Sequence, residues 1–245
     1  MATIAVFSSK GGVGKTSLSV NLAWALATAS SRRTLLWDLD AQAAASFILA
    51  PRRKQMDEAR AVIERGIAPD KLIVATDTPG LDLLPADASL RALDVVFAGL
   101  AANKRLRRIG EDLARAYDRV VIDCPPGLGV TAEQVIRGAT LILLPLIPSG
   151  LSMRAAEELT AHLGSRRKGA PPVMPVFNMV DRRRVAHRDA AAAAPDQPAL
   201  PMASVVEQMA QRHAPVGVYA PRAPVTKAIL ALSAEVERRL VKGGA

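Results

Sequence analysis

Short runs of apolar residues alternate along the chain with longer stretches whose apolar residues recur at helical spacing. After Lys15, for example, Leu18, Leu22, Ala25 and Leu26 fall on one face of a helix. Strands buried on both faces of a parallel sheet are apolar throughout, and the helices that connect them are amphipathic. The alternation therefore predicts an α/β fold, a mostly parallel twisted sheet flanked by helices on both faces.

The apolar runs place the strands, and the amphipathic stretches place the helices. The predicted strands are residues 3–8, 34–38, 72–75, 81–85, 119–123, 141–146 and 173–178. The predicted helices are residues 15–29, 56–65, 90–98, 104–117, 132–138, 152–163, 203–211 and 225–241. Residues 190–201, rich in alanine and proline, are expected to form a surface loop rather than a linker between domains. We therefore expect residues 1–245 to form a single domain.

A glycine-rich segment, KGGVGKTS, follows the first predicted strand at residues 10–17. Glycines let successive backbone N–H groups turn toward a phosphate, and the following helix adds the positive end of its dipole. In such a P-loop, Lys15 reaches the β- and γ-phosphates and the Thr16 hydroxyl binds Mg²⁺. The residues expected to hold the nucleotide are Lys10, Gly11, Gly12, Val13, Gly14, Lys15, Thr16 and Ser17.

Aspartates close two of the predicted strands. Asp38 and Asp40 end the second, in the run DLDAQ, and Asp123 ends the fifth, in the run VVIDCPP. Carboxylates at the carboxyl ends of parallel strands lie where an α/β sheet binds its ligand. An apolar strand that ends in aspartate has the layout of a Walker B motif, in which Asp123 binds Mg²⁺, usually through a water.

Together these runs resemble the motifs of the ParA/MinD family of P-loop ATPases, whose deviant Walker A motif reads KGG-x-GK-[ST]. The likeness extends from residue 3 to about residue 227, includes the run LDLLPA at residues 81–86, and weakens across residues 52–78. Two positions depart from known patterns. Ser9 replaces the first glycine of the general P-loop motif, and Ala41 replaces the proline of the family's D-x-D-P-Q run.

The resemblance implies roles for individual residues and for the cofactors ATP and Mg²⁺. Lys10 is expected to reach across a sandwich dimer to the partner's ATP, so that ATP binding and dimerisation are one event. Asp38 is expected to help hold the magnesium shell, and Asp40 to position the attacking water. Lys10, Lys15 and Asp40 are thus the expected catalytic residues, and Thr16, Asp38 and Asp123 the metal-site residues. Asn178 is the candidate for adenine contact, with a turn-forming asparagine as the alternative.

Some branches of the family do not fit. Cys124 is the only cysteine, so the chain cannot supply the two cluster ligands per subunit of the nitrogenase iron proteins. The cysteine-gated arsenite pumps have two domains, so they do not fit either. Cys124 itself is expected to be a small buried residue rather than a nucleophile. The three histidines, His162, His187 and His213, are scattered and do not suggest a metal site.

The last predicted helix bears on whether the protein binds a membrane. Its residues 229, 232, 236 and 240 are apolar and form a stripe, but Glu235, Glu237 and the absence of aromatics make it a poor lipid binder. We expect it to dock on the core. No apolar run approaches 18 residues and no basic leader precedes one, so a cytoplasmic protein without a stable membrane anchor is expected.

Charge points to an anionic partner, because the net charge is +9 and the pI is near 10.3. Phosphate contacts from lysine and arginine bind DNA without reading its sequence, whereas an aromatic content of 3% argues against base stacking. The alternative is an ordinary solvated basic surface. The main basic runs are residues 52–54, 104–108, 166–168 and 182–188, with Arg212 later. The candidate DNA contacts are Arg182, Arg183, Arg184, Arg188, Arg222 and Lys227.

These features favour a ParA-like ATPase. Such a protein dimerises with ATP, binds non-specific DNA, associates with the nucleoid, and positions a plasmid, chromosome or protein body when an adaptor protein stimulates hydrolysis. No helix-turn-helix pattern precedes the P-loop, so the short form of the family is expected. Two alternatives stay open, a MinD-like ATPase that positions at the membrane and an ATP-dependent ligase of the dethiobiotin synthetase type.

Overall fold

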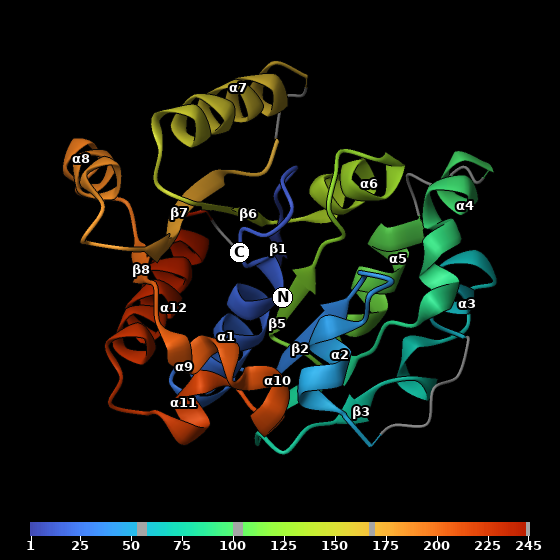
Figure 1. Cartoon of the computed structure of the whole chain (residues 1–245). Coiled ribbons are helices and arrows are strands. Elements are labelled where there is room, and N and C mark those ends of the chain that lie inside the picture. The colour runs from blue at the N-terminus through green and yellow to red at the C-terminus, as the bar shows by residue number, and fades with distance from the viewer. Residues whose placement is uncertain (53–57, 100–104, 167–169, 244–245) are drawn as a thin grey trace.

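The computed structural model describes residues 1–52, 58–99, 105–166 and 170–243, and these form an eight-stranded sheet covered by helices on both faces (Figure 1). The strand order is β3-β4-β2-β5-β1-β6-β7-β8. All neighbouring strands run parallel except β3 and β4, which are antiparallel. The predicted α/β class and mostly parallel sheet are confirmed. The strands are β1 Ala2–Val6, β2 Thr34–Asp38, β3 Val74–Ala75, β4 Leu81–Leu84, β5 Arg119–Asp123, β6 Leu141–Leu146, β7 Val173–Val180 and β8 Ala199–Pro201.

The helices connect these strands and begin within a few residues of the predicted positions in most cases. The α-helices are α1 Lys15–Thr28, α2 Ala44–Leu49, α3 Ala59–Glu64, α4 Leu93–Gly99, α5 Arg105–Leu113, α6 Val130–Gly138, α7 Gly150–Arg166, α8 Val185–Ala193, α9 Ser204–Glu207, α10 Met209–Arg212, α11 Val216–Tyr219 and α12 Pro224–Lys242, with 3-10 turns η1 Pro69–Lys71 and η2 Ala88–Ala92. Residues 56, 57 and 104 of two predicted helices lie outside the described residues.

Three expectations about the elements are wrong. Residues 190–201 are a loop only at residues 194–198, because α8 extends to residue 193 and β8 pairs with β7 from residue 199. The helix predicted at residues 203–211 is two short helices, α9 and α10. The six-residue helix α2 was not anticipated. The elements α2, β8, α9 and α10 are short, so their sequences cover too few turns or residue pairs to show a period. Helix α8 is longer, but His187 is its only buried residue, so its sequence carries no apolar stripe.

Apolar side chains form two cores, one on each face of the sheet. On one face, Val6 and Val121 pack with Leu22 of α1 and Ile229 of α12. On the other, strand residues pack with helices α3 to α6, Ile122 with Leu113 of α5 among them. Strand residues alternate between the two cores, which is why the strands are apolar along their whole length.

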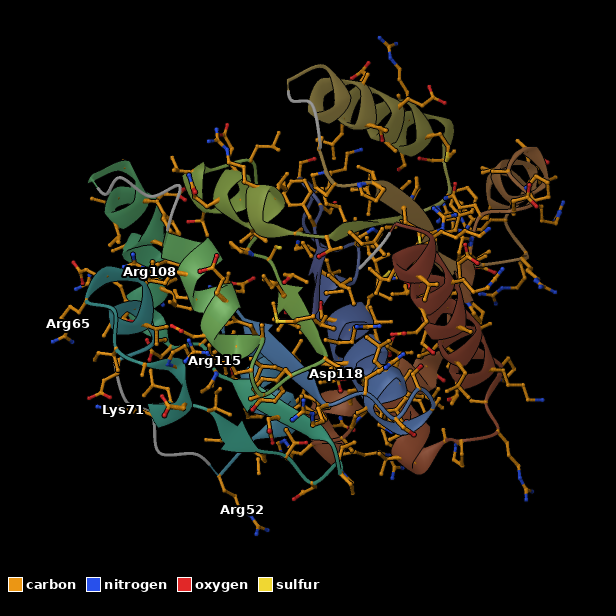
Figure 2. The ribbon with its side chains drawn as sticks, turned by 180° about the vertical axis from the view of Figure 1, so that it is seen from behind. Arg52, Arg65, Lys71, Arg108, Arg115 and Asp118 are labelled. Carbon is orange, nitrogen blue, oxygen red and sulfur yellow. The ribbon has the colours of Figure 1, made fainter. Side chains whose placement is uncertain are left out.

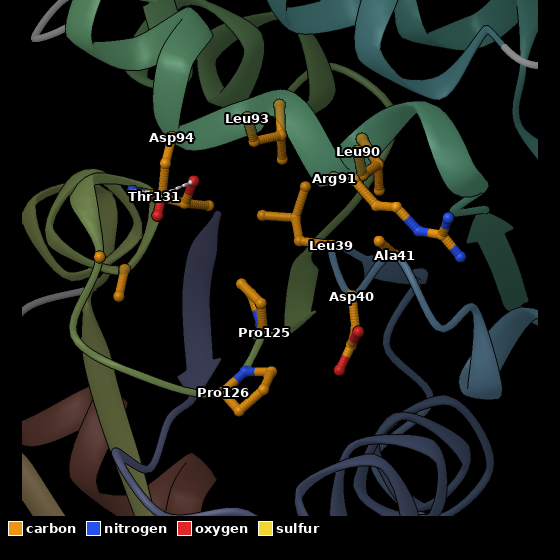
Figure 3. Close-up of a pocket in the computed structure, with 12 residues that line it drawn as sticks. Leu39, Asp40, Ala41, Leu90, Arg91, Leu93, Asp94, Pro125, Pro126 and Thr131 are labelled. Atoms are coloured by element: carbon orange, nitrogen blue, oxygen red, sulfur yellow. Dashed lines mark hydrogen bonds between the residues drawn. The ribbon is translucent and has the colours of Figure 1, made fainter.

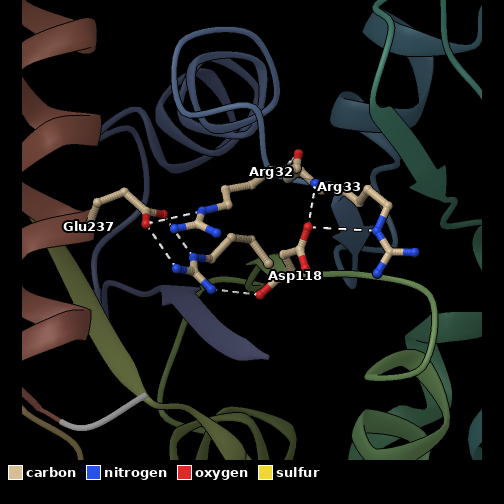
Figure 4. Close-up of polar contacts among 6 residues, drawn as sticks. Arg32, Arg33, Asp118 and Glu237 are labelled. Carbon is tan, nitrogen blue, oxygen red and sulfur yellow. Dashed lines mark hydrogen bonds and ion pairs between the residues drawn. The ribbon is translucent and has the colours of Figure 1, made fainter.

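Helix α12 is docked on the core as expected, with the apolar stripe at residues 229, 232, 236 and 240 buried. An ion pair fixes its far end to the amino edge of the sheet, where the strands begin (Figure 4). The two guanidinium nitrogens Nε and Nη2 of Arg119 donate to the two carboxylate oxygens of Glu237, each at 2.8 Å. Arg32 lies 3.5 Å from the same carboxylate, and Arg33 pairs with Asp118 at 3.6 Å. Among the described residues, no helix is both long enough and apolar enough to cross a membrane.

Candidate nucleotide-binding site

The glycine-rich segment forms a loop between the carboxyl end of β1 and the start of α1. Gly12 and Gly14 have φ angles of 72° and 82°, in the left-handed region that other residues rarely adopt. Gly14 precedes the first residue of α1, and no side chain caps that helix or places a carboxylate in its first turn. The first N–H groups of α1 therefore lack side-chain acceptors, as an anion site at a helix N-terminus requires.

The two lysines of the loop differ in exposure. Lys15 is 8% exposed, and its ammonium lies 3.4 Å from the carbonyl oxygen of Lys10 in the same loop. Its charge therefore faces the loop interior, where the phosphates of a nucleotide belong. Lys10 is exposed, and its side chain forms no ion pair with another described residue. Its backbone N–H donates to the Ser8 hydroxyl at 3.2 Å.

Two of the predicted metal-site carboxylates lie side by side next to this loop. Asp38 and Asp123 are paired residues at the carboxyl ends of the adjacent strands β2 and β5. Both are buried, at 0% and 1% exposure. Burial raises the pKa of each carboxyl above its usual range, and the charge of Asp38 adds to the rise of the pKa of Asp123. A buried pair of like charges is unfavourable unless a cation or proton compensates it.

Asp123 has one oxygen engaged and one free. Oδ1 accepts a hydrogen bond of 2.9 Å from the Ser19 hydroxyl. Oδ2 is buried and has no hydrogen-bond partner among the described residues. The hydroxyls of Ser19 and Thr16 lie close enough to lower the pKa of Asp123, partly offsetting the effect of burial. Ser19 was not predicted. It lies four residues after Lys15 and three after Thr16, on the same face of α1, and this spacing is the one signal in the sequence.

Asp38 is held in place by the start of α2. Its Oδ2 accepts hydrogen bonds from the backbone N–H of Ser46 at 2.9 Å and from the Ser46 hydroxyl at 2.8 Å. Its Oδ1 accepts from the N–H of Asp40 at 3.1 Å. The Ser46 hydroxyl in turn accepts from the N–H of Ala86, after β4, at 2.9 Å. Ser46 therefore ties the carboxylate to α2 and to the segment after β4, a role that no sequence motif indicated.

Asp40 lies at the edge of a small cavity beside this pair (Figure 3). The cavity has a volume of about 160 Å³, and Leu39, Arg91, Pro125 and Pro126 also line it. Asp40 is half-buried, and its Oδ1 accepts from the N–H of Gln42 at 2.9 Å. Its charge contributes to the raised pKa values of both Asp38 and Asp123, which places the three carboxylates close together.

The residues at this edge fit Mg²⁺. The Asp123 oxygen without a partner, the nearby Thr16 hydroxyl and a second buried carboxylate are hard oxygen ligands of the kind Mg²⁺ prefers, directly or through water. A divalent cation also relieves the repulsion between Asp38 and Asp123. Burial raises the pKa of the Cys124 thiol, which agrees with the expectation of a buried residue rather than a nucleophile.

Asn178 lies against the phosphate loop. Its side chain is 9% exposed, and its Nδ2 donates to the carbonyl oxygen of Val13 at 2.8 Å. This contact is not the turn-forming hydrogen bond that was the alternative. Contact with adenine stays a prediction.

Comparison with known proteins agrees with this geometry. Residues 1–170 match a protein family described as an AAA domain. The chain is 32% identical over 191 residues to "Chromosome partitioning protein ParA" of Caulobacter vibrioides, covering 75% of this chain and 71% of that protein. It is 34% identical over 166 residues to a "ParA family protein" of Chlamydia muridarum, covering 66% of this chain and 65% of that protein.

The chain belongs to the ParA family of P-loop ATPases. Its fold agrees with that assignment, since the septum site-determining protein MinD of Pyrococcus horikoshii, solved in complex with Mg-ADP, superposes with a TM-score of 0.79. That alignment has 22% sequence identity and covers 99% of this chain and 98% of that one. Residues 1–170, where the family matches, include the phosphate loop and all three aspartates.

In this ParA-family chain, the candidate DNA-binding arginines just before α8 and in its first turn are exposed but not equally available. Arg183 pairs with Asp181, its Nε and Nη2 donating to the two carboxylate oxygens at 2.9 and 3.0 Å. Arg188 donates to the carbonyl oxygens of Arg182 and Arg183. Arg182 and Arg184 are exposed and have no ion pair with a described residue. Arg182 and Arg184 are therefore the freest cations of this run.

The structure does not bring all six candidate DNA contacts together. The run 182–188 leads into α8, whose Ala190 packs on one core, whereas Arg222 and Lys227 flank the start of α12, whose Val225 belongs to the core on the other face. The two groups thus lie on helices that cover opposite faces of the sheet near β8 (Figure 1).

A further set of exposed cations lies at the β3 end of the sheet, around α3 and α5 (Figure 2). These are Arg52, Arg65, Lys71, Arg108 and Arg115. Acidic residues are interspersed among them, including Asp70 and Asp112, so this surface is less uniformly basic than the charge count suggests. Arg53, Lys54, Lys104, Arg167 and Lys168 of the predicted basic runs lie outside the described residues.

Proposed function

We propose that this ParA-family chain is an ATPase whose ATP-bound dimer binds non-specific DNA. Hydrolysis, stimulated by an adaptor protein, releases the DNA and so positions a cargo on the nucleoid. The observation that carries the ATPase part is the arrangement at one sheet edge, where an uncapped P-loop helix lies beside two buried carboxylates, one with an unpartnered oxygen.

The proposal divides the work among this chain's own residues. The ammonium of Lys15 and the first N–H groups of α1 bind the phosphates, and Thr16 and Asp123 hold Mg²⁺ with Asp38 behind them. Mg²⁺, when bound, neutralises charge on the β- and γ-phosphates. Asp40, half-buried at the open side of the site, orients the attacking water and accepts its proton. Lys10 is exposed, and this exposure suits a role toward a partner subunit's nucleotide.

The division between Asp40 and Lys10 gives the first test. Asp40→Ala should keep ATP binding, lower the rate of hydrolysis by about 10²-fold or more, and accumulate the ATP-bound dimer. Lys10→Ala should bind ATP as a monomer. Sedimentation velocity with MgATP and with MgADP, together with phosphate release, separates the two variants. If both variants sediment alike with MgATP, the assignment of separate roles is wrong.

The DNA part of the proposal rests on the net charge of +9 and on the exposed cations Arg182, Arg184, Arg222 and Lys227, which form no ion pair within the part of the chain that the structure describes. Dimerisation doubles the number of phosphate contacts that one surface offers. For a dimer that makes about 6–10 such contacts, the affinity for duplex DNA falls by about 10³–10⁵ between 50 and 200 mM salt. The dimer should bind all sequences alike and should bind more tightly with ATP than with ADP.

Three double variants, each with the same change in charge, test which surface binds DNA. Arg182→Glu with Arg184→Glu should weaken binding to random-sequence duplex DNA with ATP and reduce the salt dependence. Arg222→Glu with Lys227→Glu tests the α12 group separately. Arg65→Glu with Arg115→Glu makes the same change in charge at the β3 end, and should leave DNA binding much less affected. Equal losses in all the double variants would indicate a general effect of net charge rather than a binding surface.

Anionic vesicles as competitor distinguish this proposal from membrane positioning. The stripe of α12 is buried against the core, so it is not available to insert into lipid while the helix is docked. We expect no ATP-dependent binding to vesicles. Vesicle binding without DNA binding would favour the MinD-like alternative, and ATP turnover that requires a small carboxylic acid or amine would favour the ligase alternative.

A further inference from the structure

Asn178 connects the strand β7 to the phosphate loop, although 165 residues separate it from Val13. The hydrogen bond from Asn178 Nδ2 to the Val13 carbonyl oxygen is 2.8 Å long, and both residues are buried. Val13 lies between Gly12 and Gly14, the two loop residues with left-handed backbone. The bond therefore holds the peptide group that sets the direction of the neighbouring N–H groups.

An irregularity in β7 aims Asn178 at this loop. The pairing of β7 with β8 shifts between Phe177 and Val180. Within that interval, Met179 has a φ angle of 56°, which is costly for a residue with a long side chain. Irregularities of this kind redirect side chains next to functional sites. Here the strained residue follows Asn178 directly and turns the end of the strand toward the loop.

The fit between the two segments is close. A Cβ placed on Gly14 would lie 2.5 Å from Asn178 Nδ2 and 3.0 Å from the Met179 terminal methyl. Gly14 is the residue before α1, so its backbone sets the entry into the helix whose N-terminus faces the phosphates. Asn178 and Met179 thus pack against the loop from the side of β7 and limit how far it can move.

We propose that Asn178 is a positioning residue of the phosphate loop. By fixing the Val13 carbonyl, it keeps the loop N–H groups turned toward the ligand before the ligand arrives. The inference rests on the proposed nucleotide site. It differs from a contact with adenine in one measurable way, since a residue that acts through the loop affects every ligand with phosphates at this site by the same factor, whatever base it carries.

A series of ligands tests this difference. Removing the Asn178 amide leaves the buried Val13 carbonyl without its hydrogen-bond donor. The phosphate loop then samples other conformations, and its affinity for phosphate-containing ligands falls. Asn178→Ala should weaken binding of MgATP, MgGTP and magnesium tripolyphosphate by one common factor of about tenfold. Isothermal titration calorimetry measures all three in the wild type and the variant. If only MgATP weakens while tripolyphosphate is unchanged, Asn178 reads adenine and the proposal is wrong; no change with any ligand also overturns it.

A double-mutant cycle tests the contact directly. Gly14→Ala adds a methyl that strains the backbone and overlaps the Asn178 amide. In the Asn178→Ala background the closest contact is absent, so the same change should cost less affinity for tripolyphosphate there, though the strain at φ of 82° remains. Additive losses would show that the two residues do not act through each other.

Two controls keep the outcomes separate. Lys15→Ala removes the cation that faces the phosphates and should weaken tripolyphosphate binding by about 10²–10³-fold. If it does not, the proposed site is wrong, whatever Asn178 does. A thermal melt checks the fold of each variant. Should Asn178→Ala lack a cooperative transition, Asn178→Ser, with a side chain too short to reach Val13, is expected to give the same common factor.

Discussion

Buried charges occur at both edges of the sheet, and the two edges treat them differently. At the amino edge, Arg119 is 6% exposed; its Nε and Nη2 donate to Glu237, and its Nη1 donates to the carbonyl oxygen of Asp118. At the carboxyl edge, Asp38 and Asp123 are buried beside each other, and one oxygen of Asp123 has no partner. A compensated charge holds elements together, whereas an uncompensated one marks a place where a ligand supplies what is missing. The comparison supports the proposed nucleotide site at the carboxyl edge and a structural role for the ion pair at the amino edge.

Lys15→Ala should give the largest effect and leave the amino edge intact. The β- and γ-phosphates lose the buried cation beside them, so nucleotide affinity is expected to fall by about 10²–10³-fold. Equilibrium binding of a fluorescent ATP analogue measures the loss, and a thermal melt without nucleotide should be close to that of the wild type. Affinity near the wild-type value would refute the P-loop assignment.

Arg119→Ala should lower the stability of the fold and leave nucleotide binding at the carboxyl edge unchanged. Glu237 is 15% exposed and would keep only Arg32 as a partner, so the free energy of unfolding is expected to fall by about 3 kcal/mol. Urea denaturation measures this change. The nucleotide affinity of the fraction that remains folded should not change, because the ion pair lies at the opposite edge. A variant that unfolds at the wild-type urea midpoint would contradict the structural role of the pair.

Asp123→Asn should stabilise the metal-free protein while abolishing the Mg²⁺ dependence of nucleotide binding. Burial and mutual repulsion raise the pKa values of Asp38 and Asp123 above those of the unfolded chain, so the folded state holds more protons. The two carboxyls therefore destabilise the fold least below about pH 4. The free energy of unfolding falls as the pH rises through the raised pKa values.

At pH 7.5 without Mg²⁺, the neutral amide should raise the free energy of unfolding by about 1–2 kcal/mol. The pH dependence between about 4 and 7 should become shallower. Melts with EDTA across this range measure both effects, and a wild type that gains stability from pH 5 to pH 7 without Mg²⁺ would argue against an uncompensated pair.

The smallest effect is expected for Arg33→Ala, the exposed counterpart of Arg119. The side chains of Arg33 and Asp118 are 64% and 38% exposed, so water screens their attraction. The loss should stay below about 1 kcal/mol. Urea denaturation of Arg33→Ala and Arg119→Ala side by side tests whether an ion pair must be buried to contribute to stability at the amino edge. Equal losses in both variants would show that it does not.

Much of the carboxyl edge could be predicted. The P-loop residues 10–17 are contiguous, and Asp38 and Asp123 end apolar strands, so local sequence places them at the same edge once the sheet is parallel. The partners that hold these groups could not be predicted. Ser46 reaches Asp38, and Ser19 reaches Asp123 across 104 residues, and neither serine stands in a motif.

The same division applies to the fold. The period of apolar residues determined the α/β class and most helices, because burial on one or two faces leaves a repeat in the local sequence. It did not determine the antiparallel pairing of β3, the three-residue strand β8 or the break between α9 and α10. Elements of two to four residues form because adjacent strands and helices of the folded protein hydrogen-bond to them and bury them.

The sequence by itself thus determined that this chain is a P-loop protein of the ParA family, and it indicated which residues are the candidates to face a nucleotide. Only the tertiary structure decided how those residues are held. The Asn178 bond to Val13 and the Arg119 pair with Glu237 join positions 165 and 118 residues apart. Such contacts depend on the direction of each side chain after the sheet has formed, and no local pattern encodes that direction.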